Sequence, residues 1–99
     1  MKNNEELRNA LAEMYPDQID DICIFETPSY ASAVTGVSEE YQDGVQKIRV
    51  VYSYEKMVEA LMTEDGMTDE EAREFIDYNT IRALPYFPNA PIVMYDIFC

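Results

Sequence analysis

Three stretches of the chain repeat apolar residues every three or four positions, which is the spacing of one helix face. The first stretch predicts a helix over 4–14. Asn3 or Asn4 can cap its start, and Pro16 stops it because a proline has no backbone N–H to donate. The apolar face of this helix consists of Leu7, Ala10, Leu11 and Met14.

The other two helical stretches follow one another in the second half of the chain. One predicts a helix over 54–64 that ends before Gly66. The next begins at a capping box, in which Thr68 and Glu71 each bond the other's backbone, and it predicts a helix that runs to about Leu84. The inner face of this last helix consists of Ala72, Phe75, Ile76, Asn79 and Ala83.

The remaining apolar segments have the pattern of strands. A continuous apolar run predicts a strand over 19–26 that is buried on both faces. Strands over 32–38 and 45–52 form a hairpin, joined through 39–44 with a turn at Asp43–Gly44. The second hairpin strand places Ile48, Val50 and Tyr52 on one face and Lys47 and Arg49 on the other, so one face is either wet or in contact with a partner.

Prolines at positions 85, 88 and 91 predict an extended loop over 85–91, and a last strand is expected over 92–98. The predicted order is α-β-β-β-α-α-β in one domain of 99 residues. This order is typical of an α+β domain, with helices packed on a mostly antiparallel sheet. We expect its core to contain Leu7, Leu11, Phe25, Ile48, Val50, Leu61, Phe75 and Ile76.

The charge of the chain excludes several functions. Twenty acidic residues oppose seven basic ones, which gives a net charge of −13, and there is no histidine. Bare nucleic acid and anionic membranes would repel such a chain. Without histidine it lacks the commonest general base and metal ligand, so we expect no enzyme, no cofactor and no metal site. Two cysteines, Cys23 and Cys99, suit a reducing cytoplasm better than a disulfide framework, although a bond between them is possible in principle.

The segment from Val51 to Tyr95 carries a family resemblance. Its most distinctive piece is FIDYNTIRALPY, followed by APIVMY and preceded by a strand that enters YEKMVEALM. These motifs resemble a family of small acidic proteins from Firmicutes, gut clostridia and their phages or mobile elements. That family has no assigned activity, so the resemblance implies a biological setting but no residue role.

Three groups of residues are candidates for contact with a partner. Asp69, Glu70, Glu74 and Asp77 are expected to form an acidic outer face on the last helix. Tyr30, Tyr41, Tyr86 and Phe87 are aromatic residues in expected loops, where they suit an interface. Asn79 and Arg82 need polar or aromatic partners and are expected to hold the proline-rich loop, although Asn79 can also face a ligand and Arg82 can stack on Tyr78 or Tyr86.

The sequence therefore favours a small, non-enzymatic interaction protein, monomeric or a small homo-oligomer, that binds another protein. A more specific hypothesis is nucleic-acid mimicry, in which spaced carboxylates occupy the basic groove of a nucleic-acid-binding protein such as a host defence nuclease. Two alternatives stay open: a structural or assembly subunit, and an enzyme that uses carboxylates in a cleft.

Overall fold

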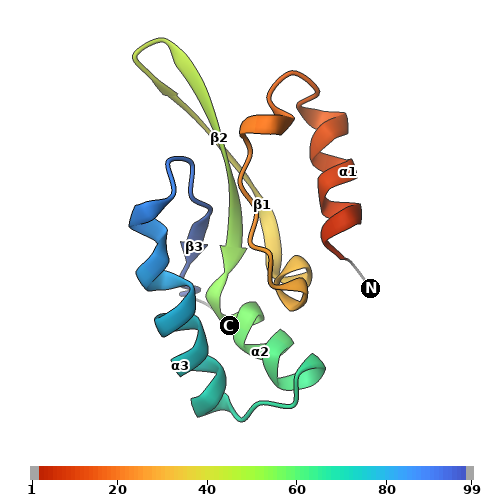
Figure 1. Cartoon of the computed structure of the whole chain (residues 1–99), viewed down its shortest axis with the longest axis vertical. Coiled ribbons are helices and arrows are strands. Elements are labelled where there is room, and N and C mark those ends of the chain that lie inside the picture. The colour runs from red at the N-terminus through yellow and green to blue at the C-terminus, as the bar shows by residue number, and fades with distance from the viewer. Residues whose placement is uncertain (1–2, 98–99) are drawn as a thin grey trace.

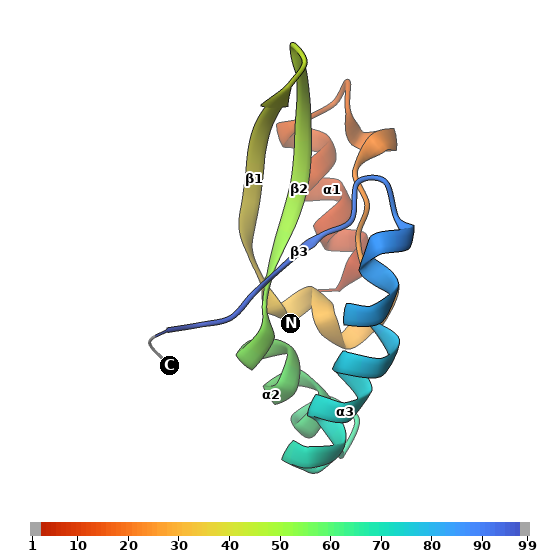
Figure 2. The ribbon, with the colours of Figure 1, turned by 90° about the vertical axis from the view of Figure 1, so that its left-hand side faces the viewer.

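The computed structural model describes residues 3–97 and confirms an α+β domain. Its sheet has the order β1-β2-β3, in which β1 and β2 pair antiparallel and the short β3 pairs parallel to β2. The sheet is thus mixed. Figures 1 and 2 show α1, α3 and η3 on one side of it, and α2 continuing from the end of β2. The elements are α1 (Asn4–Met14), η1 (Ile19–Asp21), η2 (Pro28–Ala33), β1 (Val34–Gln42), β2 (Val45–Ser53), α2 (Tyr54–Glu64), α3 (Asp69–Asn79), η3 (Ile81–Tyr86) and β3 (Ile92–Met94), with η marking 3-10 helices.

Two of the three α-helices begin at predicted capping residues, Asn3 for α1 and Thr68 for α3, whereas the cap of α2, Ser53, was not predicted. The Asn3 side chain accepts the N–H of Glu6 at 2.8 Å, and Ser53 caps α2 by accepting the N–H of Lys56. Thr68 and Glu71 form both bonds of the predicted capping box. The Thr68 N–H donates to the Glu71 carboxylate at 2.9 Å, and this bond is the main cause that lowers the pKa of the carboxyl. The sequence thus locates the starts of all three α-helices.

The end of α3 differs from the prediction. The α-helix stops at Asn79, whereas the sequence predicts about Leu84, and residues 81–86 continue as the tighter helix η3. Pro85 explains the change, because a proline in an α-helix clashes with the carbonyl four residues earlier and disfavours α geometry at the residue before it.

The hairpin strands extend further than expected. The segment 39–42 continues β1, and the connection shrinks to Asp43 and Gly44, which have φ angles of 54° and 79°. Two successive positive φ angles allow a two-residue turn that matches the twist of the strands. The last strand is shorter than predicted and ends at Met94, while Phe98 and Cys99 lie outside the described residues.

The core lies between the sheet and the helices. Ile48, Val50 and Tyr52 are all buried on the predicted face of β2, and no helix of residues 3–97 covers the opposite face, as Figure 2 shows. Of the other predicted core residues, Leu11, Leu61 and Ile76 are buried, and Leu7, Phe25 and Phe75 are partly buried against them. No helix within residues 3–97 is both long and apolar enough to cross a membrane.

The predicted strand over 19–26 is the main error of the sequence analysis. Residues 19–21 form η1, and within residues 3–97 the segment 22–27 pairs with no strand. The sheet contains only β1, which pairs with β2 at residues 45–52, and β3, which pairs with it at residues 51–53 of the described chain. The N–H of Phe25 donates to the side-chain hydroxyl of Tyr52, at 3.2 Å, and not to the backbone of a strand.

Candidate functional site

An apolar hollow lies beside the segment 22–27, and we call it the apolar cleft. One wall is residues 23–27, and the other comes from the end of α3 and from η3, with Thr80 and Ala83. Phe87 and Pro91 complete the lining, and the volume is about 340 Å³. This is at the small end of the range for ligand pockets and suits one large apolar side chain of a partner.

Two buried hydroxyl groups lie in this cleft. Tyr30 is only 1% exposed, and its hydroxyl shares a hydrogen bond of 3.2 Å with the hydroxyl of Thr80. Burial raises the pKa of Tyr30, so the phenol stays protonated at neutral pH. Phe25 packs edge-on against the Tyr30 ring, at 5.8 Å between centroids. The cleft therefore combines apolar walls with one satisfied polar pair.

Cys23 lines the same cleft as a protonated thiol. Burial raises its pKa; Arg8 opposes this effect and Glu26 adds to it. Cys99 lies outside the described residues, so its pairing with Cys23 stays a prediction. The sulfur accordingly contributes soft apolar surface to the wall.

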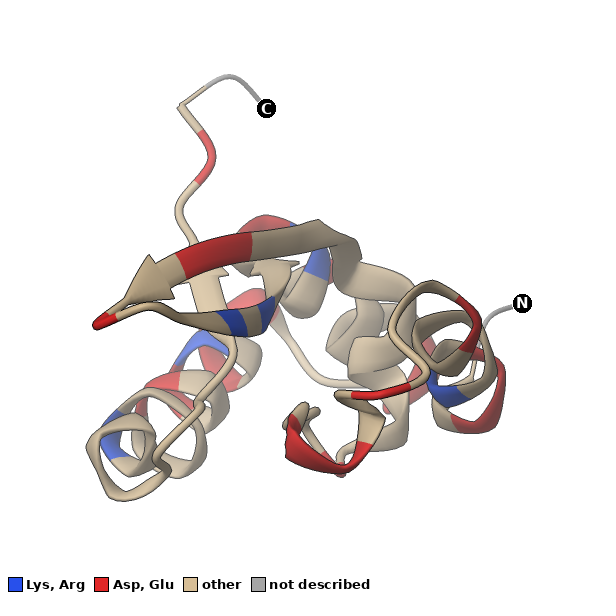
Figure 3. Ribbon diagram, turned by 90° about the horizontal axis from the view of Figure 1, so that it is seen from above, with Lys and Arg blue, Asp and Glu red and all other residues tan. Residues whose placement is uncertain are grey.

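The rim of the cleft is acidic. Glu26 belongs to the lining, and an adjoining hollow of about 270 Å³ shares Cys23 and Phe87 with it and adds Asp20 and Asp21. Within residues 3–97, none of these three carboxylates forms an ion pair. Figure 3 shows that acidic positions surround the outline of the molecule, with few basic positions between them. The apolar cleft is thus bordered by carboxylates that form no ion pair within residues 3–97.

The proline-rich loop that closes the cleft is held by residues other than those predicted. Arg49 donates from Nε to the carbonyl of Ala90 at 2.8 Å, and the Asn89 side chain donates to the carbonyl of Asp21 at 3.2 Å. Asn79 instead bonds the carbonyl of Phe75 in its own helix. Arg82 stacks on the Tyr78 ring at 4.2 Å, one of the two aromatic partners expected for it.

The predicted acidic face of α3 is only partly free. Arg73 pairs with Asp69 at 2.9 Å and holds Glu55 through two bonds of 3.0 Å, so Glu55 and then Asp69 raise its pKa. Asp77 accepts the hydroxyl of Tyr54 at 3.2 Å. These contacts fasten α3 to α2.

Glu70 and Glu74 remain exposed on α3 and form no ion pair in the described part of the chain. The four carboxylates therefore do not act as one free surface.

The aromatic candidates separate in the same way. Tyr30 is a correction, because the sequence predicts a surface loop, whereas the structure places it on η2 with a buried ring whose hydroxyl bonds Thr80 at the end of α3. Tyr41 is 75% exposed near the hairpin tip, and Tyr86 is 85% exposed on η3. Phe87 is half exposed and lines the cleft together with Tyr30 and Asn79. The cleft thus gathers three predicted candidates, whereas Tyr41 lies at the far hairpin tip.

Sequence reasoning missed the wall formed by 23–27. Its signal was present as the apolar run around Ile24, which was interpreted as a strand buried inside a sheet. Glu26, Asp20 and Asp21 at the two ends of that run could have marked it as a surface wall with an acidic rim.

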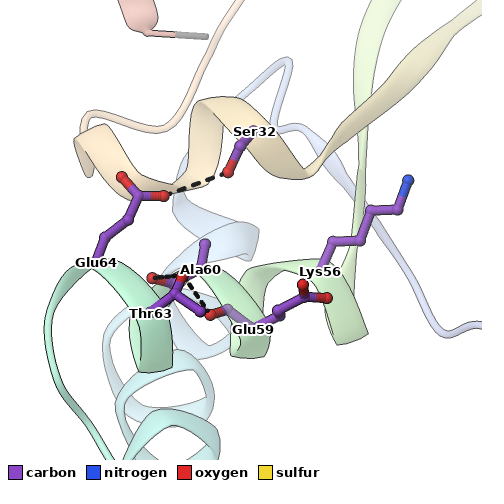
Figure 4. Close-up of a pocket in the computed structure, with 6 residues that line it drawn as sticks. All are labelled: Ser32, Lys56, Glu59, Ala60, Thr63 and Glu64. Carbon is purple, nitrogen blue, oxygen red and sulfur yellow. Dashed lines mark hydrogen bonds between the residues drawn. The ribbon is translucent and has the colours of Figure 1, made fainter. Parts of the chain in front are cut away.

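A second hollow lies between η2 and α2 and is shown in Figure 4. It is more open and holds about 260 Å³. The Ser32 hydroxyl donates to Glu64 at 3.5 Å and the Thr63 hydroxyl donates to the carbonyl of Glu59 at 3.0 Å, so several of its polar groups are already satisfied. Lys56 points away from Glu64 in this view. The hollow therefore presents little that a ligand would complete.

Within residues 3–97, no three Cys, Asp or Glu side chains gather in a way that could hold a metal ion. Comparison of the chain with protein-family models, curated proteins and solved structures finds no match. The geometry of the molecule is therefore the basis for assigning a function.

Proposed function

We propose that this chain is a small protein-binding module, whose apolar cleft receives a basic segment of a partner protein. The observation that carries the proposal is the combination of an enclosed apolar hollow with a rim of carboxylates, Asp20, Asp21 and Glu26, that have no ion-pair partner within residues 3–97. An apolar anchor side chain that fills a desolvated pocket supplies most of the affinity in many interfaces.

The charges decide which partner fits. Lys or Arg residues on either side of the anchor would meet the rim carboxylates, while an acidic segment would be repelled. The net charge of −13 extends this preference over distance, because it attracts basic partners and speeds their association at low salt. We further propose the mobile-element setting that the motifs in 51–95 led us to expect, and the reducing cytoplasm that Cys23 and Cys99 suit.

Nucleic-acid mimicry is the second candidate, and one observation favours it. The longest extent of the molecule is 43 Å, so the net charge of −13, counted over all 99 residues, places one charge on about 3.3 Å of length (43 Å divided by 13). Phosphates in one strand of DNA are spaced at ~3.4 Å, so the match is to a single strand, whereas a duplex carries one charge per ~1.7 Å of axis. In this form the partner is a basic nucleic-acid-binding protein, and the cleft does not matter.

A selection from a displayed library of random peptides tests the leading proposal. We expect the recovered peptides to combine a large apolar residue with flanking Lys or Arg. The double change Asp20→Asn and Glu26→Gln should weaken their binding about two- to thirtyfold at low salt, since it removes two exposed charge pairs. The matched control is Glu70→Gln with Glu74→Gln, which removes the same charge from the outer side of α3.

A second pair of variants tests the apolar hollow. Ala83→Leu places a larger side chain on the cleft wall and should abolish binding, whereas Ala10→Leu makes the same change at an exposed site on α1. Recovery of no basic peptide refutes the proposal. Mimicry predicts a different result. The rim variant and its charge-matched control would then lose equal affinity for the peptide, and duplex-binding proteins would displace the peptide.

A further inference from the structure

The outer edge of β1 has no neighbouring strand. β2 pairs along one side of β1, and in the described part of the chain no strand pairs with the other side. Figure 2 shows β1 at the margin of the sheet, with no helix of residues 3–97 beside that margin. The pairing of β1 with β2 is regular over 36–42 and shifts only between Val34 and Gly36. A regular free edge of this kind is a template on which a further strand can pair.

The register shows which backbone groups point out from this edge. Gln42 and Val45 flank the two-residue turn, so they are the pair that shares the hydrogen bond of the turn. Along antiparallel strands, such pairs alternate with pairs whose N–H and C=O groups point away from the partner strand. Val37, Glu39 and Tyr41 therefore direct both backbone groups outward. Within residues 3–97, these groups form no hydrogen bond.

Two carboxylates lie at the middle of the edge. Glu39 and Glu40 are exposed, and because they are adjacent on a strand their side chains point to opposite faces of the sheet. Glu39 accepts the Tyr15 hydroxyl and the Gln46 side-chain amide, and neither donor carries a charge that would compensate it. Glu40 lies 3.7 Å from Arg49, which is the loosest ion pair among the described residues. A strand added at this edge would thus meet a carboxylate on each of its faces.

These charges decide between two occupants of the edge. A second copy of β1 would overlap most fully in the antiparallel register centred on Glu39, which is the middle of 36–42. That register places the two Glu39 side chains opposite each other, and like charges in this position destabilise a strand pair. The net charge of −13 on each copy adds repulsion over distance. A strand that carries Lys or Arg opposite Glu39 and Glu40 would be attracted instead.

We propose that the outer edge of β1 binds an extended, basic segment of another protein by strand addition. The segment pairs with the backbone of Val37, Glu39 and Tyr41 and places adjacent basic side chains opposite Glu39 and Glu40. An apolar side chain of the segment covers the Tyr41 ring, which is 75% exposed. Main-chain bonds supply affinity and the charges supply specificity. No residue of β1 lines the apolar cleft, so this inference does not rest on the proposed function.

A displayed library of random peptides tests the side-chain part of the proposal. The library is selected on the parent protein and depleted on the variant Glu39→Gln with Glu40→Gln, which keeps the size of both side chains. We expect the recovered peptides to combine adjacent Lys or Arg residues with β-branched or aromatic residues, and to bind this variant about two- to thirtyfold more weakly at low salt. The charge-matched control, Glu70→Gln with Glu74→Gln on α3, should bind them as the parent does. Binding should also survive Ala83→Leu, which fills the apolar cleft.

Amide hydrogen exchange of the intact protein tests the backbone part. In the free protein, the outward amides of Val37, Glu39 and Tyr41 should exchange faster than those of Ser38 and Glu40, which bond β2. The tightest recovered peptide should slow exchange of the outward amides and leave the inward ones unchanged. The inward amides are thus a control within the same strand.

Three results would overturn strand addition at β1. The library can yield no peptide that depends on Glu39 and Glu40, or the peptides can bind without protecting the outward amides. The third result is protection of those amides that rises with protein concentration in the absence of peptide, which assigns the edge to a second copy of the chain. None of these results bears on the apolar cleft, because cleft binding is recognised separately by its loss in Ala83→Leu.

Discussion

Replacing Tyr52 with phenylalanine removes one oxygen atom from the centre of the core. Tyr52 is fully buried, and its hydroxyl accepts the one hydrogen bond that the Phe25 N–H donates within residues 3–97. The Phe25 ring packs against it at 4.6 Å between centroids. The change therefore keeps the ring contacts but leaves the Phe25 N–H without an acceptor. Such a loss costs ~1–3 kcal/mol of unfolding free energy at neutral pH.

The same substitution changes how stability depends on pH. Burial raises the pKa of Tyr52 from 10.0 to about 12, although the Phe25 N–H partly opposes the effect. A group whose pKa is raised by folding contributes stability that is complete below its unfolded pKa and is lost as the pH rises through its folded pKa. For this residue the loss falls between pH 10 and about 12 and amounts to roughly 3 kcal/mol.

Urea unfolding, followed by circular dichroism from neutral to strongly alkaline pH, measures both effects. The Tyr52→Phe variant should be less stable than the parent at neutral pH, and the gap should close above pH 10 because phenylalanine cannot ionise. All other titrating groups are common to both proteins and cancel in the difference. Equal stability at neutral pH, or a gap that stays constant through the alkaline range, would refute this account of Tyr52.

Two further variants probe the core and the closing loop. Leu61→Ala should lower the free energy of unfolding in urea by ~2–5 kcal/mol because Leu61 is fully buried. Met62→Ala, at a neighbouring exposed site, should lower it much less, and similar losses in the two variants would contradict the assigned helix face. Arg49→Ala should speed proteolysis and amide exchange of 87–91 because it removes the bond to Ala90, while Lys47→Ala on the same face of β2 should leave both unchanged; equal rates in the two variants would show that Arg49 does not hold the loop.

The sequence predicts those parts of the fold that depend on local chemistry. Helix starts follow from Ser, Thr and Asn caps, and the hairpin turn follows from Asp43 and Gly44, because these residues act on their own backbone. The buried face of β2 follows from strict alternation. Periodicity was a sufficient guide to the buried face of β2, whereas on α1 it assigned Ala10 and Met14 to the apolar face and both are exposed.

The parts that failed depend on neighbours distant in sequence. The run around Ile24 has the composition of a strand, but the N–H of Phe25 bonds the side-chain hydroxyl of Tyr52, 27 residues later, instead of the backbone of a strand. Tyr30 has loop neighbours on both sides, and only the approach of Thr80 shows that its ring is buried. Arg49 was expected on a wet or partner-facing strand surface, but it bonds the carbonyl of Ala90. Contacts between residues that are far apart in the sequence leave no pattern in the sequence around either residue.

The sequence predicted individual residues of the candidate site, but not that they lie together. Asn79, Phe87 and Tyr30 were singled out for separate reasons, and the fold brings all three to one cleft. The acidic rim was hidden because carboxylates are common along the whole chain, and it becomes distinct only once the ion pairs of Asp69 and the hydrogen bond of Asp77 are known.

The most direct test of the proposed site is an NMR titration of the isotope-labelled protein with the tightest basic peptide from the displayed library. The account predicts that backbone shifts concentrate on residues 22–27, on Thr80 and Ala83, and on 87–91, which together line the apolar cleft and its rim. Shifts that concentrate instead on Glu70 and Glu74 of α3, or on the uncovered face of β2 around Lys47, would contradict it.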